Sequence, residues 1–195
     1  MLHCYLDIIL LGDKQMNKII AIVGMCGAGK SEVTNYFEEK GFARIYFGAV
    51  TFEEMAKRGL ENNQDNERKI REEFRASGDM AIYAKLNEKK IAEAYSKGNV
   101  VIESLYSWSE YKYIKDIYGD NFKIISVVVD KDIRKERIGN RPTRALTSAE
   151  VDKRDLTEIE NIEKAGPIAI ADYYILNNSD MSHLLNECER ILGRL

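Results

Sequence analysis

A glycine-rich loop followed by a lysine and a hydroxyl residue is the feature of this sequence that most clearly predicts chemistry. Residues 24–31 read GMCGAGKS and satisfy the pattern G-x-x-x-x-G-K-[ST] in full. Glycines let successive backbone N–H groups turn inward as an anion nest, and the following helix N-terminus adds partial positive charge. In such a loop the lysine contacts the β- and γ-phosphates of a nucleotide, and the hydroxyl residue binds Mg²⁺. We expect the phosphate contacts to come from Gly24, Gly27, Ala28, Gly29, Lys30, Ser31 and Glu32.

A carboxylate follows another apolar run, VVIES at 100–104. This run places Glu103 at the carboxyl end of a predicted strand, where open α/β sheets bind their ligands. There Glu103 could work together with Ser31, either by holding a water bound to Mg²⁺ or by accepting the proton of an attacking hydroxyl. The alternative is a glutamate that only ends a strand at the surface.

Arginines gather further along the chain, in DIRKERIGNRPTR at 132–144. Arg134, Arg137 and Arg141 have the spacing of one helix face. Pro142 disfavours helical geometry at the residue before it, so Arg141 and Arg144 are predicted on a loop. Arginines on a closing lid can stabilise the charge of phosphoryl transfer and exclude water. We expect catalytic roles for Arg137, Arg141 and Arg144, the alternative being a solvated face.

The sequence predicts the residues that would bind a phosphate acceptor less clearly. Arg68, Arg71 and Arg75 lie in a charged helical stretch and could meet an acceptor phosphate, or could equally face solvent. Tyr106 and Trp108 follow the carboxylate and could stack on a base, although packing is the alternative. Among these, Arg71, Arg75 and Tyr106 are our candidate substrate contacts.

The elements that must position these residues alternate between strands and helices. Strands are predicted at 18–23, 42–47, 99–104, 122–130 and 171–178. A helix is predicted at 30–40, and a C-terminal helix carries Leu184, Leu185, Cys188 and Leu192. The alternation indicates a parallel α/β sheet. Residues 50–98 are too long for one crossover and are predicted to form a helical insert that binds the acceptor, while 140–150 would form the lid.

Composition and length limit the number of domains and the kinds of partner that the chain can have. A chain of 195 residues with net charge −3 is long enough for one domain and is no polybasic nucleic-acid binder. The three cysteines lack metal-ligand spacing, which is typical of a reduced cytoplasmic protein.

The first fifteen residues are too short to span a membrane and are a poor signal peptide. We expect translation to start at Met16, with 1–15 a misread extension and 16–195 a single domain built around the phosphate loop. The alternative is a short extra strand or arm.

From about residue 18 to the end, the chain resembles the P-loop nucleoside monophosphate kinase superfamily. Within it, the chain is similar to the archaeal-type adenylate-kinase-related and dephospho-CoA-kinase-like group. The resemblance is carried by GMCGAGKSEV, KGFARIYFGAV, RKIREEF…GDMAIYAK, VVIES and KRDLTEIE…GPIAIADYYILNN. It implies a three-layer fold with a five-stranded parallel sheet, ATP and Mg²⁺ as cofactors, a helical acceptor-binding region and a short lid.

Two departures fall on the acceptor side of this pattern. The turn after the second strand, usually Gly-Asp with a basic residue shortly after, is here Gly48-Ala49 with Phe52. The end of the third strand, usually Asp-Gly with an arginine nearby, is Glu103-Ser104. The Asp-x-Asp of dephospho-CoA kinases after strand two is missing, which counts against that acceptor.

The leading hypothesis is an ATP-dependent kinase that phosphorylates a small nucleotide, most simply a (deoxy)nucleoside monophosphate, with Gly48 among the substrate contacts. The alternatives are a kinase for a nucleoside or another acceptor such as a dephospho-CoA-like molecule, and a non-catalytic ATP-binding switch protein. No nucleic-acid or membrane partner is expected, and the protein would be a monomer or homodimer.

Overall fold

The computed structural model describes residues 17–195. The expected start at Met16, and its alternative of an arm in residues 1–15, concern residues outside this range.

Five parallel strands form one sheet, as the sequence predicts. Their order is β2-β3-β1-β4-β5, and every neighbouring pair is parallel. The central strand β1 is buried on both faces, which agrees with its unbroken apolar run. The strands are β1 (Ile19–Val23), β2 (Ala43–Tyr46), β3 (Val100–Glu103), β4 (Phe122–Val128) and β5 (Tyr173–Leu176).

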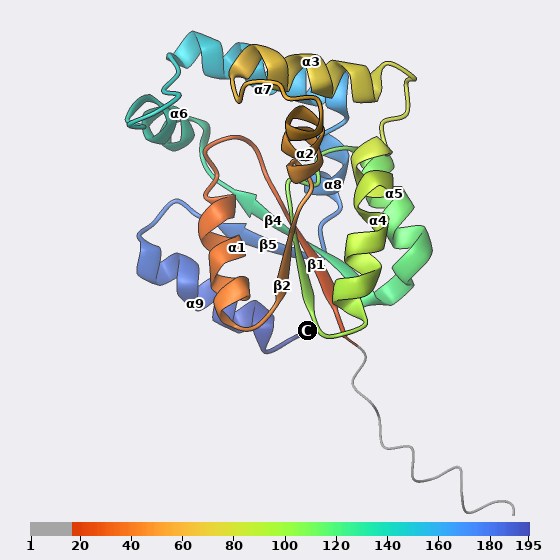
Figure 1. The fold of residues 1–195 in the computed structure, drawn as a ribbon. Coiled ribbons are helices and arrows are strands. Elements are labelled where there is room, and N and C mark those ends of the chain that lie inside the picture. Colours follow the sequence, from red (N-terminus) through yellow and green to blue (C-terminus); the bar gives the residue numbers. More distant parts are fainter. Residues whose placement is uncertain (1–16) are drawn as a thin grey trace, which may run out of the picture.

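Helices cover both faces of this sheet and its carboxyl end (Figure 1). Figure 1 shows α1 and α9 on one face, α4 and α5 on the other, and α2, α3 and α7 beyond the strand ends. The helices are α1 (Lys30–Glu39), α2 (Ala49–Lys57), α3 (Gln64–Arg75), α4 (Ile82–Tyr95), α5 (Trp108–Tyr118), α6 (Lys131–Gly139), α7 (Ser148–Ile162), α8 (Ala165–Ala169) and α9 (Met181–Leu192), with a short 3₁₀ turn η1 (Gly119–Asn121).

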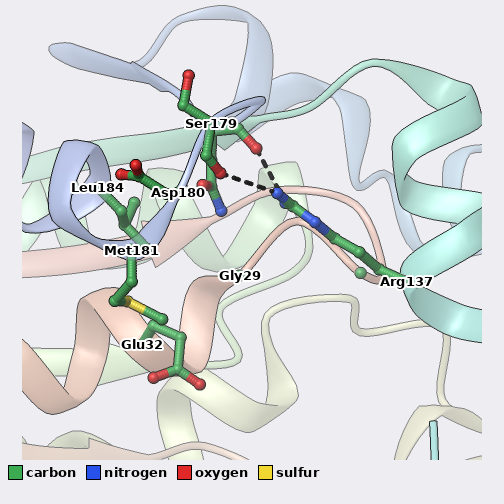
Figure 2. A pocket seen from close by; sticks show the side chains of 9 residues that line it. Gly29, Glu32, Arg137, Ser179, Asp180, Met181 and Leu184 are labelled. Atoms are coloured by element: carbon green, nitrogen blue, oxygen red, sulfur yellow. Dashed lines mark hydrogen bonds between the residues drawn. The ribbon is translucent and has the colours of Figure 1, made fainter. Parts of the chain in front are cut away.

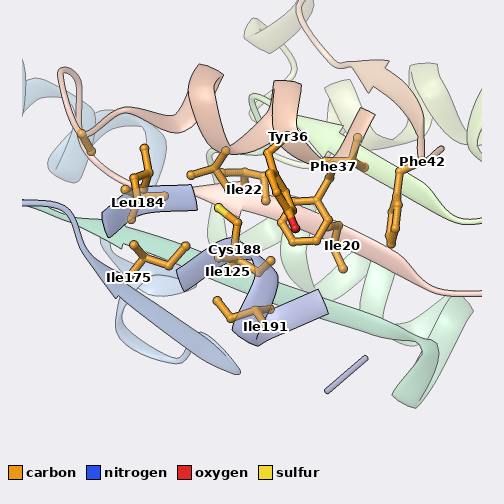
Figure 3. Close-up of a cluster of buried hydrophobic side chains, with 14 of the residues drawn as sticks. Ile20, Ile22, Tyr36, Phe37, Phe42, Ile125, Ile175, Leu184, Cys188 and Ile191 are labelled. Atoms are coloured by element: carbon orange, nitrogen blue, oxygen red, sulfur yellow. The ribbon is translucent and has the colours of Figure 1, made fainter. Parts of the chain in front are cut away.

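Two apolar cores lie on opposite faces of the sheet. The core between the sheet, α1 and α9 is drawn in Figure 3, where Phe37 and Cys188 pack over Ile20 and Ile125. The core on the other face joins α4 and α5 to the alternate residues of the same strands. Successive side chains of a strand point to opposite faces of the sheet, so one short apolar run contributes to both cores.

Three helices, α2, α3 and α4, fill the long segment between β2 and β3. They are separated by the stretches 58–63 and 76–81, the second of which contains Gly78. The side chain of Asn63 caps α3 by accepting from the backbone N–H of Asn66 at 2.9 Å. This arrangement carries α3 over the carboxyl end of the sheet, on the same side as the glycine-rich loop (Figure 1).

Candidate active site

The loop between β1 and α1 has a backbone that only glycine accepts easily. Gly24, Gly27 and Gly29 have φ values of 143°, 82° and 94°. A Cβ on Gly24 would lie 2.4 Å from the carbonyl oxygen of Val127, which belongs to the neighbouring strand and cannot yield. The loop is therefore fixed in shape by its glycines and by the strand beside it.

An asparagine directly after β5 is hydrogen-bonded to the backbone of this loop. Asn177 is buried, and its Nδ2 donates to the carbonyl oxygen of Ala28 at 2.9 Å. Its own backbone N–H donates to the carbonyl oxygen of Val128. We did not single out Asn177 from the sequence, although it lies in the ILNN stretch that carries the family resemblance.

Lys30 begins α1 directly beneath the loop. Its Nζ donates to the carbonyl oxygen of Met25 at 3.0 Å. Burial, the ammonium of Lys164 and, least, the guanidinium of Arg154 together lower the pKa of Lys30 to about 8, against the opposing effects of Cys26 and Glu158. The ammonium of Lys30 is therefore shielded from water and lies near two further cations, a setting in which a phosphate would stabilise its charge.

Glu103 lies at the carboxyl end of β3, the strand next to β1. Its Oε2 accepts two hydrogen bonds from Arg44, from Nε at 2.9 Å and from Nη2 at 2.5 Å. Nη1 of Arg44 in turn donates to Asn35 and Glu38 of α1. Sequence reasoning did not include Arg44, whose position in β2 becomes adjacent to Glu103 only through the β2–β3 pairing.

The arginines of the predicted lid separate into distinct positions. Helix α6 ends at Gly139, so Arg141 and Arg144 do lie on a loop. Arg141 reaches the loop at residue 26, with Nη1 3.6 Å from Sγ of Cys26. Arg144 extends the other way, to Oε1 of Glu67 on α3 at 3.2 Å.

Arg137 lies in a pocket beside the glycine-rich loop (Figure 2). Its guanidinium donates to the backbone carbonyl oxygens of Asn177 at 2.9 Å and Ser179 at 3.4 Å. The pocket has a volume of about 210 Å³ and is also lined by Gly29, Glu32, Asp180, Met181 and Leu184. It adjoins the phosphate loop on the β5–α9 side, where a flat group attached to the phosphates could lie.

Arg134, on the same helix, is buried and has a structural role. Its Nη1 donates to the carbonyl oxygen of Cys26 at 2.9 Å, and its two terminal nitrogens bind the carboxylate of Asp155 on α7. Val151 of α7 also packs against Cys26. Helix α7 is thereby attached to the phosphate loop, and Cys26 fills a small apolar space there.

The arginines of α3 that we predicted to contact an acceptor already have partners within the protein. Arg71 donates to Oε2 of Glu67 at 3.1 Å, and the guanidinium of Arg75 lies 4.8 Å from the ring centroid of Tyr83. Glu67 is 5% exposed, so one buried carboxylate joins α3 to Arg144 of the lid loop.

At the turn after β2, the ring of Tyr46 explains sterically why residue 48 is a glycine. A Cβ there would lie 2.5 Å from the ring of Tyr46, so the tyrosine covers the position that a side chain would occupy. Tyr106 donates to Oγ of Ser104 at 3.2 Å, and burial raises its pKa to about 12. The ammonium of Lys164 already lies 4.5 Å from the ring centroid of Tyr106 and covers a face that base stacking would use.

A second charged group, from α7 and the segment after it, was not singled out from the sequence. Glu158 receives hydrogen bonds from Arg154 at 2.9 Å and from Nζ of Lys164 at 2.5 Å. These residues lie near Lys30, since they alter its pKa. The stretch KRDLTEIE is part of the family resemblance, but only the folded chain shows that its charges face the phosphate loop.

The donors near the loop suit Mg²⁺. Within residues 17–195 there is no group of three or more His, Cys, Asp or Glu residues able to hold a metal ion. Mg²⁺ keeps most of its waters and takes one or two protein oxygens besides those of a nucleotide. The hydroxyl of Ser31 and the carboxylate of Glu103 are oxygen donors of this kind, at the amino end of α1 and the carboxyl end of β3.

No helix in the part of the chain that the structure describes is long and apolar enough to cross a membrane.

Comparison with known proteins places this site in a family. A family model described as an AAA domain matches residues 20–164. A UPF0200 protein of Sulfurisphaera tokodaii is 33% identical and covers 91% of this chain and 97% of that relative. A UPF0200 protein of Thermococcus kodakarensis is 30% identical over the same shares of the two chains.

Solved structures share the fold at low sequence identity. A gluconokinase from Sinorhizobium meliloti has a TM-score of 0.56 at 15% identity, covering 92% of this chain and 93% of its own. A shikimate kinase from Bacteroides thetaiotaomicron has 0.55 at 16%, covering 91% and 99%. A dephospho-CoA kinase from Campylobacter jejuni has 0.56 at 15%, covering 90% and 96%.

The chain belongs to the UPF0200 proteins and to the AAA domain family, and its fold is that of the P-loop kinases.

Proposed function

We propose that the protein is a Mg-ATP-dependent phosphotransferase whose acceptor is a (deoxy)nucleoside monophosphate. The observation that carries the proposal is the convergence of three kinds of groups on one loop. The glycine-fixed nest and Lys30 supply the phosphate cradle, Glu103 supplies a carboxylate one strand away, and arginines approach from the lid segment and α7. A protein that only senses a nucleotide has little need of the carboxylate and the arginines.

Each group has a definite task in this proposal. The backbone N–H groups of residues 24–30 bind the β-phosphate, and Lys30 neutralises the β- and γ-oxygens. Mg²⁺ bound by Ser31, with Glu103 holding one of its waters, would neutralise further charge on the phosphates. Arg137 lines the pocket that would receive the rest of the donor nucleotide.

The pairing of Glu103 is compatible with an acceptor that is already anionic. Its Oε2 accepts both hydrogen bonds from Arg44, so one oxygen of the carboxylate is occupied and the group is held in place. A carboxylate held in this way is well suited to orienting a water or a metal ion. A phosphate acceptor needs no general base, because its oxygens are ionised at neutral pH.

A hydroxyl acceptor is the second candidate. It is supported by the fold neighbours, which include proteins named gluconokinase, shikimate kinase and dephospho-CoA kinase. Because their identities lie at 15–16%, they bear on the fold rather than on the substrate.

A panel of acceptors separates these possibilities. Nucleosides, nucleoside and deoxynucleoside monophosphates and dephospho-CoA are supplied with Mg-ATP, and ADP formation is followed against a Lys30→Ala control. We expect stimulation by one or more monophosphates and none in the control. Stimulation by nucleosides alone would replace the anionic acceptor with a hydroxyl, and no stimulation by any compound would refute the kinase.

A further inference from the structure

Cationic side chains gather near Lys30. Lys164 is buried and Arg154 is partly exposed, and both pair with the carboxylate of Glu158. The described residues offer Lys30 itself only the backbone carbonyl of Met25. A charge that is shielded from water is costly unless it is paired, so Lys30, which has no carboxylate partner among the described residues, is suited to receive an anionic ligand.

Lys164 is the most deeply buried cation of this group. It is 3% exposed, although lysine is almost never fully buried without a partner, and its ammonium lies between Glu158 and the ring of Tyr106. Its charge lowers the pKa of Lys30 more than any other single charge does.

Lys164 lies against the segment that follows β3, which is the predicted acceptor side of the site. The ring of Tyr106, which Lys164 covers, belongs to the segment directly after β3, and its hydroxyl donates to Ser104 beside Glu103. Lys164 therefore lies near Lys30 and near the residues that follow the candidate magnesium carboxylate. A γ-phosphoryl group that moves from the donor towards an acceptor occupies the space between those two sets of residues.

We propose that Lys164 is a second catalytic lysine, held by Glu158, which contacts the oxygens of the transferred γ-phosphoryl group from the acceptor side. The reaction breaks the bond from the γ-phosphorus to the β,γ-bridging oxygen, and ADP leaves with that electron pair. A bond forms from an acceptor oxygen to the same phosphorus. Lys164 stays protonated throughout and stabilises the charge on the equatorial oxygens, while Glu158 is its positioning residue.

This inference rests on the proposed phosphotransferase, and it makes a narrower claim that binding can test without knowing the acceptor. Mg-ADP lacks the γ-phosphate, whereas the Mg complex of the non-hydrolysable analogue AMPPNP carries it. Isothermal titration at pH 7 gives the ratio of the two dissociation constants for the wild type, Lys164→Met and the control Lys153→Met. Lys153 is an exposed residue of α7, outside the charged group.

We expect the wild type and Lys153→Met to bind the triphosphate analogue more tightly than ADP. Lys164→Met should lose about tenfold of that preference while its affinity for Mg-ADP changes less than about threefold, as for one charge-assisted contact to the γ-phosphate. Because Lys164→Met removes a partner of the buried Glu158, the double variant Lys164→Met/Glu158→Gln serves as a second test in which neither charge remains. It should show the same loss.

An unchanged preference in a folded Lys164→Met or in the double variant would show that Lys164 is only structural, and would leave the proposed function intact. If the wild type itself shows no preference for the analogue and forms no ADP with any acceptor, the proposed function fails and this inference fails with it. Circular dichroism of each variant distinguishes lost binding from lost folding.

Discussion

Nucleotide binding should make the protein take up protons, because the phosphates oppose the effect that burial and the surrounding cations have on the pKa of Lys30. In the free protein burial and the charges of Lys164 and Arg154 lower the pKa of Lys30 from 10.5 to about 8. A triphosphate placed on its ammonium supplies opposite charge and should return the pKa towards 10.5. At pH 8 about half of the free protein carries a neutral Lys30, and the bound protein carries almost none, so binding should take up about 0.5 proton.

The same linkage fixes how affinity depends on pH. The protonated fraction of the free lysine falls from about 0.9 at pH 7 to about 0.1 at pH 9, so the affinity for Mg-AMPPNP should weaken about tenfold over this range. Proton uptake should rise from about 0.1 at pH 7 to about 0.9 at pH 9. Titration calorimetry in buffers of different ionisation enthalpy measures the uptake directly.

Lys30→Met is the matched control, since it removes the titrating group while the other residues near the loop remain. The difference in proton uptake between wild type and variant at pH 8 is therefore the quantity to measure. A difference below about 0.1 proton would mean that Lys30 is already charged in the free protein or does not meet the phosphates, and would refute the reasoning.

Three further substitutions test separate parts of the structure. Asn177→Ala removes the buried hydrogen bond to Ala28 and should lower the free energy of unfolding by about 1–3 kcal/mol and weaken ADP binding, as urea denaturation and calorimetry would report. Phe37→Ala should cost about 3–5 kcal/mol in urea denaturation without altering the nucleotide pocket, because Phe37 is fully buried in the α1–α9 core. Glu103→Gln should lower kcat about 100-fold and raise the Mg²⁺ requirement with little change in thermal stability, and an unchanged kcat would mean that Glu103 serves only to pair with Arg44.

The sequence predicts those parts of the fold that depend on local pattern. The apolar run of β1 and the glycines after it specify the strand, the loop and the helix that follows, since each depends on residues close together in the chain. Pro142 likewise predicts the end of α6 and the loop placement of Arg141 and Arg144.

The partners within the site could not be predicted in the same way. Arg44 meets Glu103 because β2 pairs with β3, across 59 residues of chain. Asn177 reaches Ala28 across 149 residues, and the spacing of residues along the chain does not encode such contacts. Lys164 appears in sequence as one lysine among many, and only its burial beside Tyr106 and Glu158 distinguishes it.

The central claim is that the γ-phosphoryl group of ATP is transferred to a nucleotide rather than to water. ³¹P nuclear magnetic resonance of a mixture of protein, Mg-ATP and the monophosphate that most stimulates ADP formation follows each phosphorus atom. We predict that the γ-resonance of ATP decreases while the β-resonance of a new nucleoside diphosphate increases in equal amount, and that Lys30→Ala abolishes both changes. Loss of the γ-resonance to inorganic phosphate alone, or an unchanged ATP spectrum with every acceptor, would contradict the account.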